Sequence, residues 1–294
     1  MDRAALDQAV SELRANAEAW ANRPLSRKIA HVEQLIAGIV SVAPEQVAAA
    51  GRAKGAEGDQ HRGEEWLHGP LLVVRNLRLL LRALREVQRG GRPELPRKAL
   101  RRTADGRLVA RIFPLELTDR LLYGGFTAEV WMQPGVSEES LPETMASFYR
   151  QAAPEGRVAL VLGAGNGPSI GPLDAVYKLF VEGQSVLLKM NPVNAYLAPF
   201  IERAFAPLIR IGALRVVCGG ADEGAYLCEH EGIDEVHITG SDRTHDAIVF
   251  GSDDEAEARK AAGEPRLHKR VTSELGNVSP VIIVPGNWSR AELR

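Results

Sequence analysis

Cysteine is scarce in this chain of 294 residues, which carries only Cys218 and Cys228. Two cysteines are too few for a disulfide framework, and with His230 and His237 they do not show the spacing of paired metal ligands. We therefore expect neither a disulfide-stabilised secreted domain nor a metal centre. A reducing cytoplasm is the default compartment.

Long apolar runs and an excess of one charge are missing as well. No run approaches the length of a membrane span, and Met1-Asp2-Arg3 leads into a polar amphipathic helix rather than a signal peptide. Lys and Arg number 36 against 38 Asp and Glu, a net charge of -2. We therefore expect neither a membrane nor a nucleic acid as a partner.

What is present, 45% apolar and 25% charged residues, is typical of a globular protein with a sizeable core in one large or two ordinary domains. Residues 1–107 are predicted to be a helical region that ends in a basic linker. Apolar residues at helical spacing indicate helices within 1–55, with a break at Pro24 and a cap at Ser26. Another helix is predicted over 71–87, and residues 89–107 read as a Pro/Gly linker.

The helix over 71–87 carries a stripe of arginines opposite a leucine face. Such a stripe could bind phosphates, but a solvated helix face explains it more simply. The stripe consists of Arg75, Arg78, Arg82, Arg85 and Arg89.

Residues 108–152 predict a small β element and a helix. Strand-like runs cover 108–113, 121–123 and 126–132, and 138–152 has a helical pattern. From Arg157 onward, apolar runs of strand length alternate with helical segments. The strands are predicted at 158–162, 185–188, 214–218, 235–239 and 270–273. Helices are predicted between them at 173–182, 195–210, 223–229 and 242–262.

This alternation predicts an α/β fold with a doubly wound, mainly parallel, Rossmann-like sheet, preceded by the helical region and the small β element. Such sheets bind ligands at the carboxyl ends of their strands. Small and polar residues follow four of the predicted strands, at 163–171, 189–192, 219–220 and 239–241. Together they favour a nucleotide site, although the ordinary Rossmann fingerprint is not met, since Lys189 rather than an acidic residue closes the second strand.

The loop after the first strand also contains Gly167-Pro168-Ser169-Ile170-Gly171, formally a nucleophile elbow. An elbow needs its serine directly at the strand end, in a strained turn. Here several residues intervene after Leu162, and a proline precedes the serine. The sequence therefore argues against a serine hydrolase.

The last predicted strand delivers one carboxylate, Glu274, and small residues follow it at Gly276, Asn277 and Ser279. A carboxylate at a strand end, beside backbone that can be approached closely, suits a general base. A surface glutamate before a turn is the plainer interpretation.

Taken together, these strand ends resemble the aldehyde dehydrogenase superfamily. The family's loop asparagine matches Asn166, its lysine matches Lys189, and its Phe-Thr-Gly-Ser resembles residues 238–241. Its Gly-x-x-x-Gly resembles Gly220 and Gly224, with His230 also in place. Its Leu-Glu-Leu-Gly-Gly-Lys-Ser-Pro resembles residues 273–280. The resemblance is specific over 157–280 and diffuse before that.

The resemblance implies NAD(P)-dependent oxidation of a small-molecule aldehyde to a carboxylic acid through a cysteine thiohemiacetal and thioester. Asn166 would stabilise the oxyanion and Glu274 would be the general base that activates water. Lys189 would bind the adenosine ribose, and Ser241, at a helix start, the pyrophosphate. The residues implied for NAD or NADP are Lys189, Gly220, Gly224, Thr239, Gly240, Ser241, Leu275 and Gly276.

Several positions depart from the family pattern. Pro192 stands where many NAD-preferring members carry a glutamate, which leaves NAD versus NADP open. Asn277 replaces a glycine, and residues 252–264 read as an exposed insertion. Neither cysteine matches the nucleophile's place. We therefore expect the chain to be the N-terminal and cofactor-binding portion, ending before the catalytic cysteine and inactive alone.

The expected division is 1–107, 108–152, a nucleotide-binding domain at 153–277, and 278–294. The last segment would hold the first strand of a catalytic domain, at 278–284. The full-length form is expected to be a homo-oligomer. An acyl-CoA or acyl-phosphate reductase of the same superfamily and a non-catalytic nucleotide-binding truncation stay open.

Overall fold

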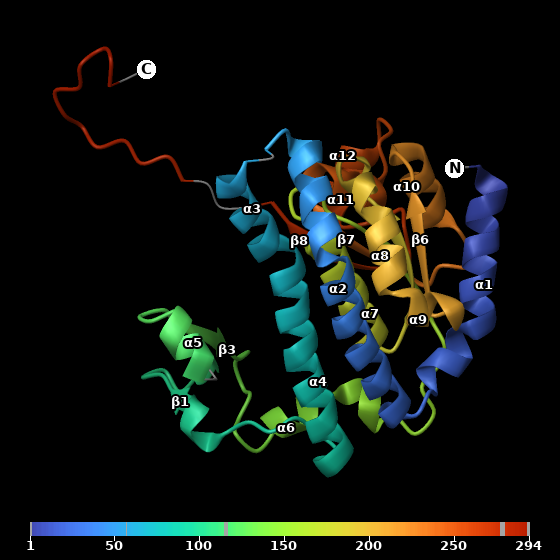
Figure 1. Ribbon diagram of the computed structural model, residues 1–294, viewed down its shortest axis with the longest axis horizontal. Helices are drawn as coiled ribbons and strands as arrows, with labels where there is room; N and C mark the ends of the chain where they lie inside the picture. Colours follow the sequence, from blue (N-terminus) through green and yellow to red (C-terminus); the bar gives the residue numbers. More distant parts are fainter. Residues whose placement is uncertain (1, 57, 115–116, 277–279, 293–294) are drawn as a thin grey trace.

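In the computed structural model, residues 2–56, 58–114, 117–276 and 280–292 are described. A five-stranded sheet with helices on both faces forms the centre of the molecule (Figure 1). Its strands run β6-β5-β4-β7-β8, and every neighbouring pair is parallel. The predicted doubly wound parallel sheet is therefore confirmed. Its strands are β4 (Val158–Leu162), β5 (Ser185–Met190), β6 (Leu214–Cys218), β7 (Glu235–Gly240) and β8 (Arg270–Leu275).

The strands form where the sequence is apolar without interruption. All six residues of β5 are buried, as are the first four of β4, because helices cover both faces of the sheet. The chain first runs from β4 outward to β6, and then returns to the other side of β4 to form β7 and β8. The strand order therefore reverses between β4 and β7, where sheets of this kind form a crevice.

One face of the sheet packs against five helices in a large apolar core that includes Leu35, Leu77, Leu179 and Phe205. The other face packs against a second core, in which Leu6 and Leu13 meet Leu160 and Leu227. The helices of the first face are α2 (Leu25–Lys54), α4 (Leu72–Gly90), α7 (Ile170–Phe180), α8 (Ala198–Ala204) and α9 (Ala206–Arg210). Those of the second are α1 (Arg3–Ala21), α10 (Ala221–Glu229) and α11 (Asp242–Phe250).

The small β element lies beside α4, away from the main sheet (Figure 1). Its antiparallel strands are β1 (Leu100–Arg102), β2 (Leu108–Phe113) and β3 (Ala128–Trp131). The predicted strand at 121–123 is wrong, because 117–122 forms helix α5 (Leu117–Leu122). Asp119 favours the first turn of that helix, and Arg75 of α4 donates a 2.9 Å hydrogen bond to its carboxylate.

Other boundaries also differ from the prediction. Ser26 is no cap, since α2 begins after Pro24. Proline in the first turns of α8 and α9 divides the helix predicted at 195–210, where the 3-10 helix η4 (Pro192–Leu197) comes first. Gly251, at a φ of 92°, separates α11 from α12 (Ala256–Ala262) within the helix predicted at 242–262.

The remaining segments were predicted less completely. Residues 138–152 form only α6 (Leu141–Thr144) and the 3-10 helix η3 (Ser147–Arg150). The linker at 89–107 contains the 3-10 helix η2 (Arg97–Ala99) as well as β1. Helix α3 (Asp59–Trp66) and the π-helix η1 (Leu67–Leu71) were not predicted.

The segment at 252–264 is exposed as expected, and α12 buries none of its residues. The arginine stripe of α4 makes ion pairs, since Arg85 lies 2.7 Å from Glu33 and Arg82 2.9 Å from Glu86. No helix among the described residues is both long and apolar enough to span a membrane.

Residues 277–279, which include Asn277 and Ser279, lie outside the described residues, and so do the first two positions of the strand predicted at 278–284. Residues 280–284 form no strand, and Val281 to Val284 are exposed. No strand pairs with them in the described chain, so their backbone gains no ladder hydrogen bonds. Figure 1 shows this segment leading away from the sheet.

Candidate functional site

A cavity of about 850 Å³ opens at the carboxyl ends of the parallel strands. Its lining comes from the segments after β4, β5, β6 and β7 and from the end of β8. All candidate residues from the sequence except Leu275 line it: Asn166, Lys189, Gly220, Gly224, Thr239, Gly240, Ser241, Glu274 and Gly276. The fold thus brings together residues that are up to 110 positions apart (166 to 276).

The loop after β4 is held from the side of β5. The amide of Gly163 donates to the carbonyl of Lys189 at 2.9 Å. The buried side chain of Asn194 donates to the carbonyls of Ala164 at 3.0 Å and Gly165 at 3.1 Å. These bonds fix the backbone immediately before Asn166, whose own side chain is exposed at the cavity. Sequence reasoning missed Asn194, although an asparagine shortly after a strand-ending Asn-Pro pair is a sign of an ordered turn.

Lys189 reaches the cavity from the carboxyl end of β5. The residue is only 7% exposed, and its ammonium donates to the carbonyl of Gly219 at 2.8 Å. Burial lowers the pKa of Lys189, while Glu223 opposes this shift. A Cβ at Gly224 would lie 3.5 Å from the Cε of Lys189, an ordinary van der Waals distance, so Gly224 lies directly beside the lysine side chain.

The N-terminus of α10 is capped by Glu223, an acidic residue of its first turn. Glu223 accepts a 2.7 Å hydrogen bond from the amide of Gly220, and this bond is the main cause of the lowered pKa of its carboxyl group. An acidic residue at this position stabilises the positive end of a helix. Glu223 was not singled out in the sequence, although its place three residues after Gly220 is that of a helix cap. Because the amide of Gly220 donates to this carboxylate, it is not available to bind another anion.

The end of β7 supplies Thr239, Gly240 and Ser241. Ser241 caps α11, because its hydroxyl accepts from the amide of Thr244 at 3.2 Å. The positive end of α11 therefore faces the cavity, which Thr244 also lines. The hydroxyl of Thr239 is directed to α7, where it donates to Asp174 at 2.9 Å.

Glu274 lies directly opposite Thr239 in the β7–β8 pairing. Its side chain is exposed, so water can solvate the carboxylate. Leu275 pairs with Gly240 but does not line the cavity. Gly276 has a φ of 61°, a conformation that favours glycine, and its amide donates to the carbonyl of Gly240 at 3.0 Å. This bond joins the two strand ends beside Glu274.

The two thiols are not activated. Cys228 lines the cavity but is 3% exposed, and burial raises its pKa to about 11. Burial also raises the pKa of Cys218. A thiolate is the nucleophilic form of cysteine, so neither environment favours attack on a substrate.

Ser169 of the formal nucleophile elbow is 4% exposed and precedes the first turn of α7. A buried serine at a helix start cannot present its hydroxyl as an elbow does. Among the described residues, no group of three or more His, Cys, Asp and Glu side chains could hold a metal ion.

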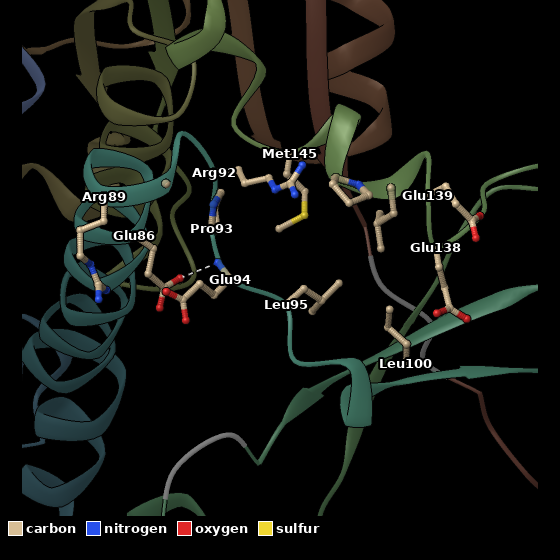
Figure 2. A pocket seen from close by; sticks show the side chains of 13 residues that line it. Glu86, Arg89, Arg92, Pro93, Glu94, Leu95, Leu100, Glu138, Glu139 and Met145 are labelled. Atoms are coloured by element: carbon tan, nitrogen blue, oxygen red, sulfur yellow. Dashed lines mark hydrogen bonds between the residues drawn. The ribbon is translucent and has the colours of Figure 1, made fainter.

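A second cavity, of about 860 Å³, lies between the end of α4 and the segment around α6 (Figure 2). Its lining mixes acidic residues such as Glu86 and Glu138 with Arg89 and Arg92. Figure 2 shows Glu86 accepting from the backbone of Glu94, a bond of 2.9 Å that closes the linker onto α4. Arg89 is the last residue of the arginine stripe, but none of the candidate catalytic or nucleotide-binding residues lines this cavity, so size alone does not make it the functional site.

The sequence model of the aldehyde dehydrogenase family matches residues 125–287, which is more than half of the chain. The chain belongs to the aldehyde dehydrogenase family. The match includes β4 to β8 and the whole lining of the cavity.

Two curated members of this family show how far the similarity extends. The chain is 32% identical to N-succinylglutamate 5-semialdehyde dehydrogenase of Sphingopyxis alaskensis over 145 residues, 48% of this chain and 26% of that protein. It is 35% identical to cytosolic aldehyde dehydrogenase 1 of Rattus norvegicus over 123 residues, 40% of this chain and 22% of that protein. The chain thus matches about a quarter of the length of these aldehyde dehydrogenases.

Solved structures of aldehyde dehydrogenases share the fold. The aldehyde dehydrogenase C variant of Pseudomonas syringae, in complex with NAD+ and octanal, aligns with a TM-score of 0.51 and 19% identity over 96% of this chain and 44% of that one. Glyceraldehyde-3-phosphate dehydrogenase of Methanocaldococcus jannaschii, in complex with NADP, aligns with a TM-score of 0.57 and 12% identity over 95% of this chain and 48% of that one. At these identities the likeness supports the fold alone.

Proposed function

We propose that residues 153–277 are the nucleotide-binding unit of an NAD(P)-dependent aldehyde-oxidising enzyme. The observation that carries this proposal is that the candidate residues from five strand ends line one cavity. Its volume of about 850 Å³ lies within the range of about 300–1,000 Å³ that is usual for small-molecule sites.

The lining suits a dinucleotide in three respects. Lys189 is the only basic residue among the described residues that line the cavity, and its ammonium donates to Gly219 close to Gly224. Lys189 would bind the adenosine ribose there. The positive end of α11, capped by Ser241, would face the pyrophosphate. Gly220 and Gly240 would allow close backbone approach.

The choice between NAD and NADP is left to measurement. Pro192 offers no carboxylate to the ribose hydroxyls, which does not favour NAD. Asp222 and Glu229 line the same cavity and would repel the additional phosphate of NADP. Both nucleotides therefore belong in the first experiment.

The proposed chemistry needs a base and an oxyanion donor. Glu274 is exposed, with access to water, and would act as the general base. The amide of Asn166, on a loop fixed by Asn194, would donate to the oxyanion of the aldehyde. The nicotinamide ring accepts a hydride when it is bound. Gly276 and Leu275 would keep the strand ends together beside the base through the bond to Gly240.

A nucleotide-binding protein without oxidation chemistry is a second candidate. It is favoured by the raised pKa of both Cys218 and Cys228, which leaves the chain of 294 residues without an activated thiol. We expect this chain to bind NAD(P) without oxidising aldehydes. Turnover of a simple aldehyde that is abolished by Cys218→Ser would contradict this expectation.

The direct test is a calorimetric titration of the chain with NAD+ and with NADP+. We expect binding at up to millimolar nucleotide, and we expect Lys189→Met to weaken it at least about tenfold, because a charge-assisted hydrogen bond contributes about 1.5–3 kcal/mol. Lys260→Met is the matched control, since Lys260 pairs with Asp246 outside the cavity. No heat at millimolar nucleotide with a folded chain would refute the proposal.

The substrate would be a small-molecule aldehyde, and the full-length form would be a homo-oligomer in a cytoplasmic compartment. Residues 278–294 would lead into the unit that carries the nucleophile.

A further inference from the structure

A carboxylate and an imidazole lie behind Thr239, outside the lining of the cavity. Asp174 of α7 accepts the hydroxyl of Thr239 at 2.9 Å and lies 3.5 Å from the Nε2 of His237. The same Nε2 is 3.4 Å from the hydroxyl oxygen of Thr239. The side chains of Asp174 and His237 are only 20% and 16% exposed, so this triangle is largely shielded from water. Thr239 is the member that reaches the cavity.

The other ring nitrogen of His237 is also engaged. Nδ1 lies 2.9 Å from the hydroxyl oxygen of Thr272. That hydroxyl donates in turn to a carboxylate oxygen of Glu235 at 3.5 Å. When Thr272 donates to Glu235, its oxygen accepts from Nδ1–H. In the protonated ring, Nε2 carries a second proton, which is directed to Asp174. In the neutral ring, Nε2 has a lone pair that can accept from the hydroxyl of Thr239. Protonated His237 therefore leaves the Thr239 hydroxyl with Asp174 as its acceptor, while neutral His237 competes for that hydroxyl.

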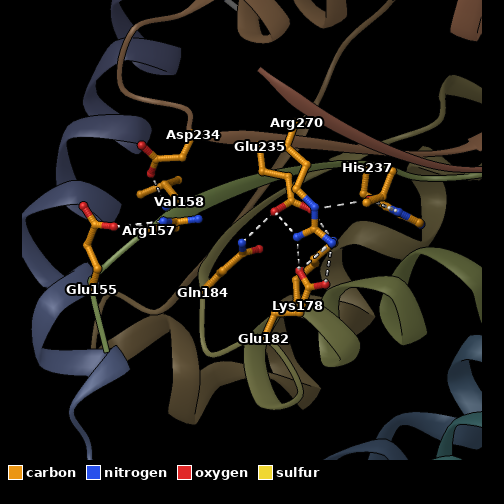
Figure 3. Close-up of polar contacts among 11 residues, drawn as sticks. Glu155, Arg157, Val158, Lys178, Glu182, Gln184, Asp234, Glu235, His237 and Arg270 are labelled. Atoms are coloured by element: carbon orange, nitrogen blue, oxygen red, sulfur yellow. Dashed lines mark hydrogen bonds and ion pairs between the residues drawn. The ribbon is translucent and has the colours of Figure 1, made fainter. Parts of the chain in front are cut away.

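Charged groups from every neighbouring element bear on His237. Asp174 and Lys178 come from α7, Glu235 from β7 itself and Arg270 from β8. Lys178 donates to Glu235 at 2.5 Å, and Arg270 donates to its other oxygen at 2.9 Å (Figure 3). The negative charge of Glu235 is thus offset by two cations, while Asp174 lies 3.5 Å from the Nε2 of His237.

We propose that Asp174 and His237 are positioning residues for the nucleotide site, because they fix the side chain of Thr239. Through Thr239 they also fix the end of β7, where Gly240 and Ser241 follow. Strand β7 has this support from α7 in addition to its pairing with β4 and β8. The inference rests on the proposed function, since it concerns the same cavity. The two residues act through Thr239 and do not contact the ligand themselves.

The test measures the dissociation constant of NAD+ for the whole chain between about pH 5.5 and pH 8, the range in which an imidazole usually titrates. We expect affinity in the wild-type chain to fall about threefold as pH rises, because neutral His237 loosens Thr239. His237→Gln should remove this pH dependence. Asp174→Asn should weaken binding about fivefold, the worth of about one hydrogen bond, and also flatten the profile.

Thr239→Val tests whether the effect passes through the hydroxyl. It should weaken binding as Asp174→Asn does, and the double variant should be no weaker than either single one. His245→Gln is the matched control, because His245 contacts Asp246 at 3.1 Å in an equivalent pair that does not line the cavity. It should keep the affinity and the pH profile of the wild-type chain.

The outcomes separate the two claims. A wild-type chain that binds no nucleotide refutes the proposed function and this inference with it. A wild-type chain that binds, with unchanged affinity and pH profile in Asp174→Asn and His237→Gln, overturns the inference alone. If Asp174→Asn fails to fold, as judged by its thermal transition, Thr239→Val and His237→Gln decide the question without it.

Discussion

The ammonium nitrogen of Lys28 lies 4.4 Å from the centroid of the Phe148 ring. Lys28 belongs to α2 and is 1% exposed, and its nitrogen donates to the carbonyl of Ala21 at 3.2 Å. Two more rings surround it, those of Trp20 at 5.0 Å and Tyr149 at 5.6 Å. Burial is the main cause that lowers the pKa of Lys28, to about 7. This lysine joins α1, α2 and η3 by contacts with ring faces.

Replacing Lys28 should make the fold less dependent on pH. The unfolded lysine keeps its proton up to about pH 10.5, while the folded one loses it near pH 7. Between these values the unfolded state binds more protons, so the free energy of unfolding rises with pH by about 1.4 kcal/mol per unit. From pH 7 to pH 9 the wild-type chain should gain about 2.3 kcal/mol relative to Lys28→Met, because the folded lysine is still half protonated at pH 7. Urea denaturation at the two pH values measures this.

Lys98→Met serves as the control for that experiment, because Lys98 is exposed. It should parallel the wild-type chain at both pH values. Equal pH dependence in wild type and Lys28→Met would show that Lys28 remains charged inside its aromatic surroundings.

Removing one member of the buried pair of Lys178 and Glu235 should lower the free energy of unfolding strongly, whereas replacing both members with apolar residues should lower it little. Each side chain is 2% exposed. Glu235→Leu removes the closest carboxylate from the ammonium of Lys178 and leaves it Glu182 and the ring of Tyr177, and we expect a loss of about 3 kcal/mol in the free energy of unfolding. Lys178→Met combined with Glu235→Leu should recover most of it, because no buried charge then lacks its partner. Additive losses in the two single variants and the double variant would contradict this.

Glu235 also predicts a response to acid. Burial raises the pKa of its carboxyl group, but hydrogen bonds from Lys178 and Gln184 outweigh this and lower the pKa overall. The stabilisation from Glu235 is therefore present above the usual range of a carboxyl group and is lost as pH falls through the lowered value. Thermal unfolding of the wild-type chain and Glu235→Gln should converge as the solution becomes more acidic. A gap that stays constant down to the unfolding pH would count against the pair.

Gly38 should not tolerate a methyl group. A Cβ there would lie 2.4 Å from the carbonyl oxygen of Ala204, where α2 crosses α8. We expect Gly38→Ala to lower the free energy of unfolding by at least about 2 kcal/mol, because backbone must move. Gly63→Ala is the matched control, since Gly63 is exposed in α3 with nothing within 4 Å, and should be stabilising by about 0.5–1 kcal/mol. Equal stability of the two variants would mean that α2 and α8 separate easily.

The two thiols should differ in their rates of alkylation. Cys218 is partly exposed, while Cys228 is buried with a pKa of about 11. With iodoacetamide at neutral pH, Cys218 should react at least about tenfold faster than Cys228, because modification needs both access and thiolate. Mass spectrometry of the labelled chain, with Cys218→Ser as reference, measures both rates. Rapid labelling of Cys228 would indicate that the cavity wall opens.

The main sheet could be predicted because its strands carry their own signal. Residues 158–162 form β4 as predicted, since an uninterrupted apolar run has few alternatives to a buried strand. Residues 121–123 look equally strand-like, yet they belong to or follow α5, which depends on Asp119 meeting Arg75 of α4, 44 positions earlier. Local pattern cannot report such a contact.

The candidate site was predictable to the extent that strand ends meet at one edge of a parallel sheet. That rule brings Asn166, Lys189 and Glu274 to one cavity. It says nothing about Asp174, because the bond to Thr239 depends on how α7 is rotated over β7. The cap at Glu223 lay within reach of sequence reasoning, since the spacing alone indicates it.

The attachments of α1 bear on how this protein is made. Arg14 bonds to Asp234 at 2.6 Å, and Trp20 to the carbonyl of Leu179 at 3.2 Å, so the first helix is fastened to residues that a ribosome adds much later. Until β4, β5 and β6 have emerged, the apolar stripe with Leu6 and Leu13 has no sheet to cover. During synthesis the nascent chain therefore exposes this helix to chaperones and to other chains, and its burial must come late in folding.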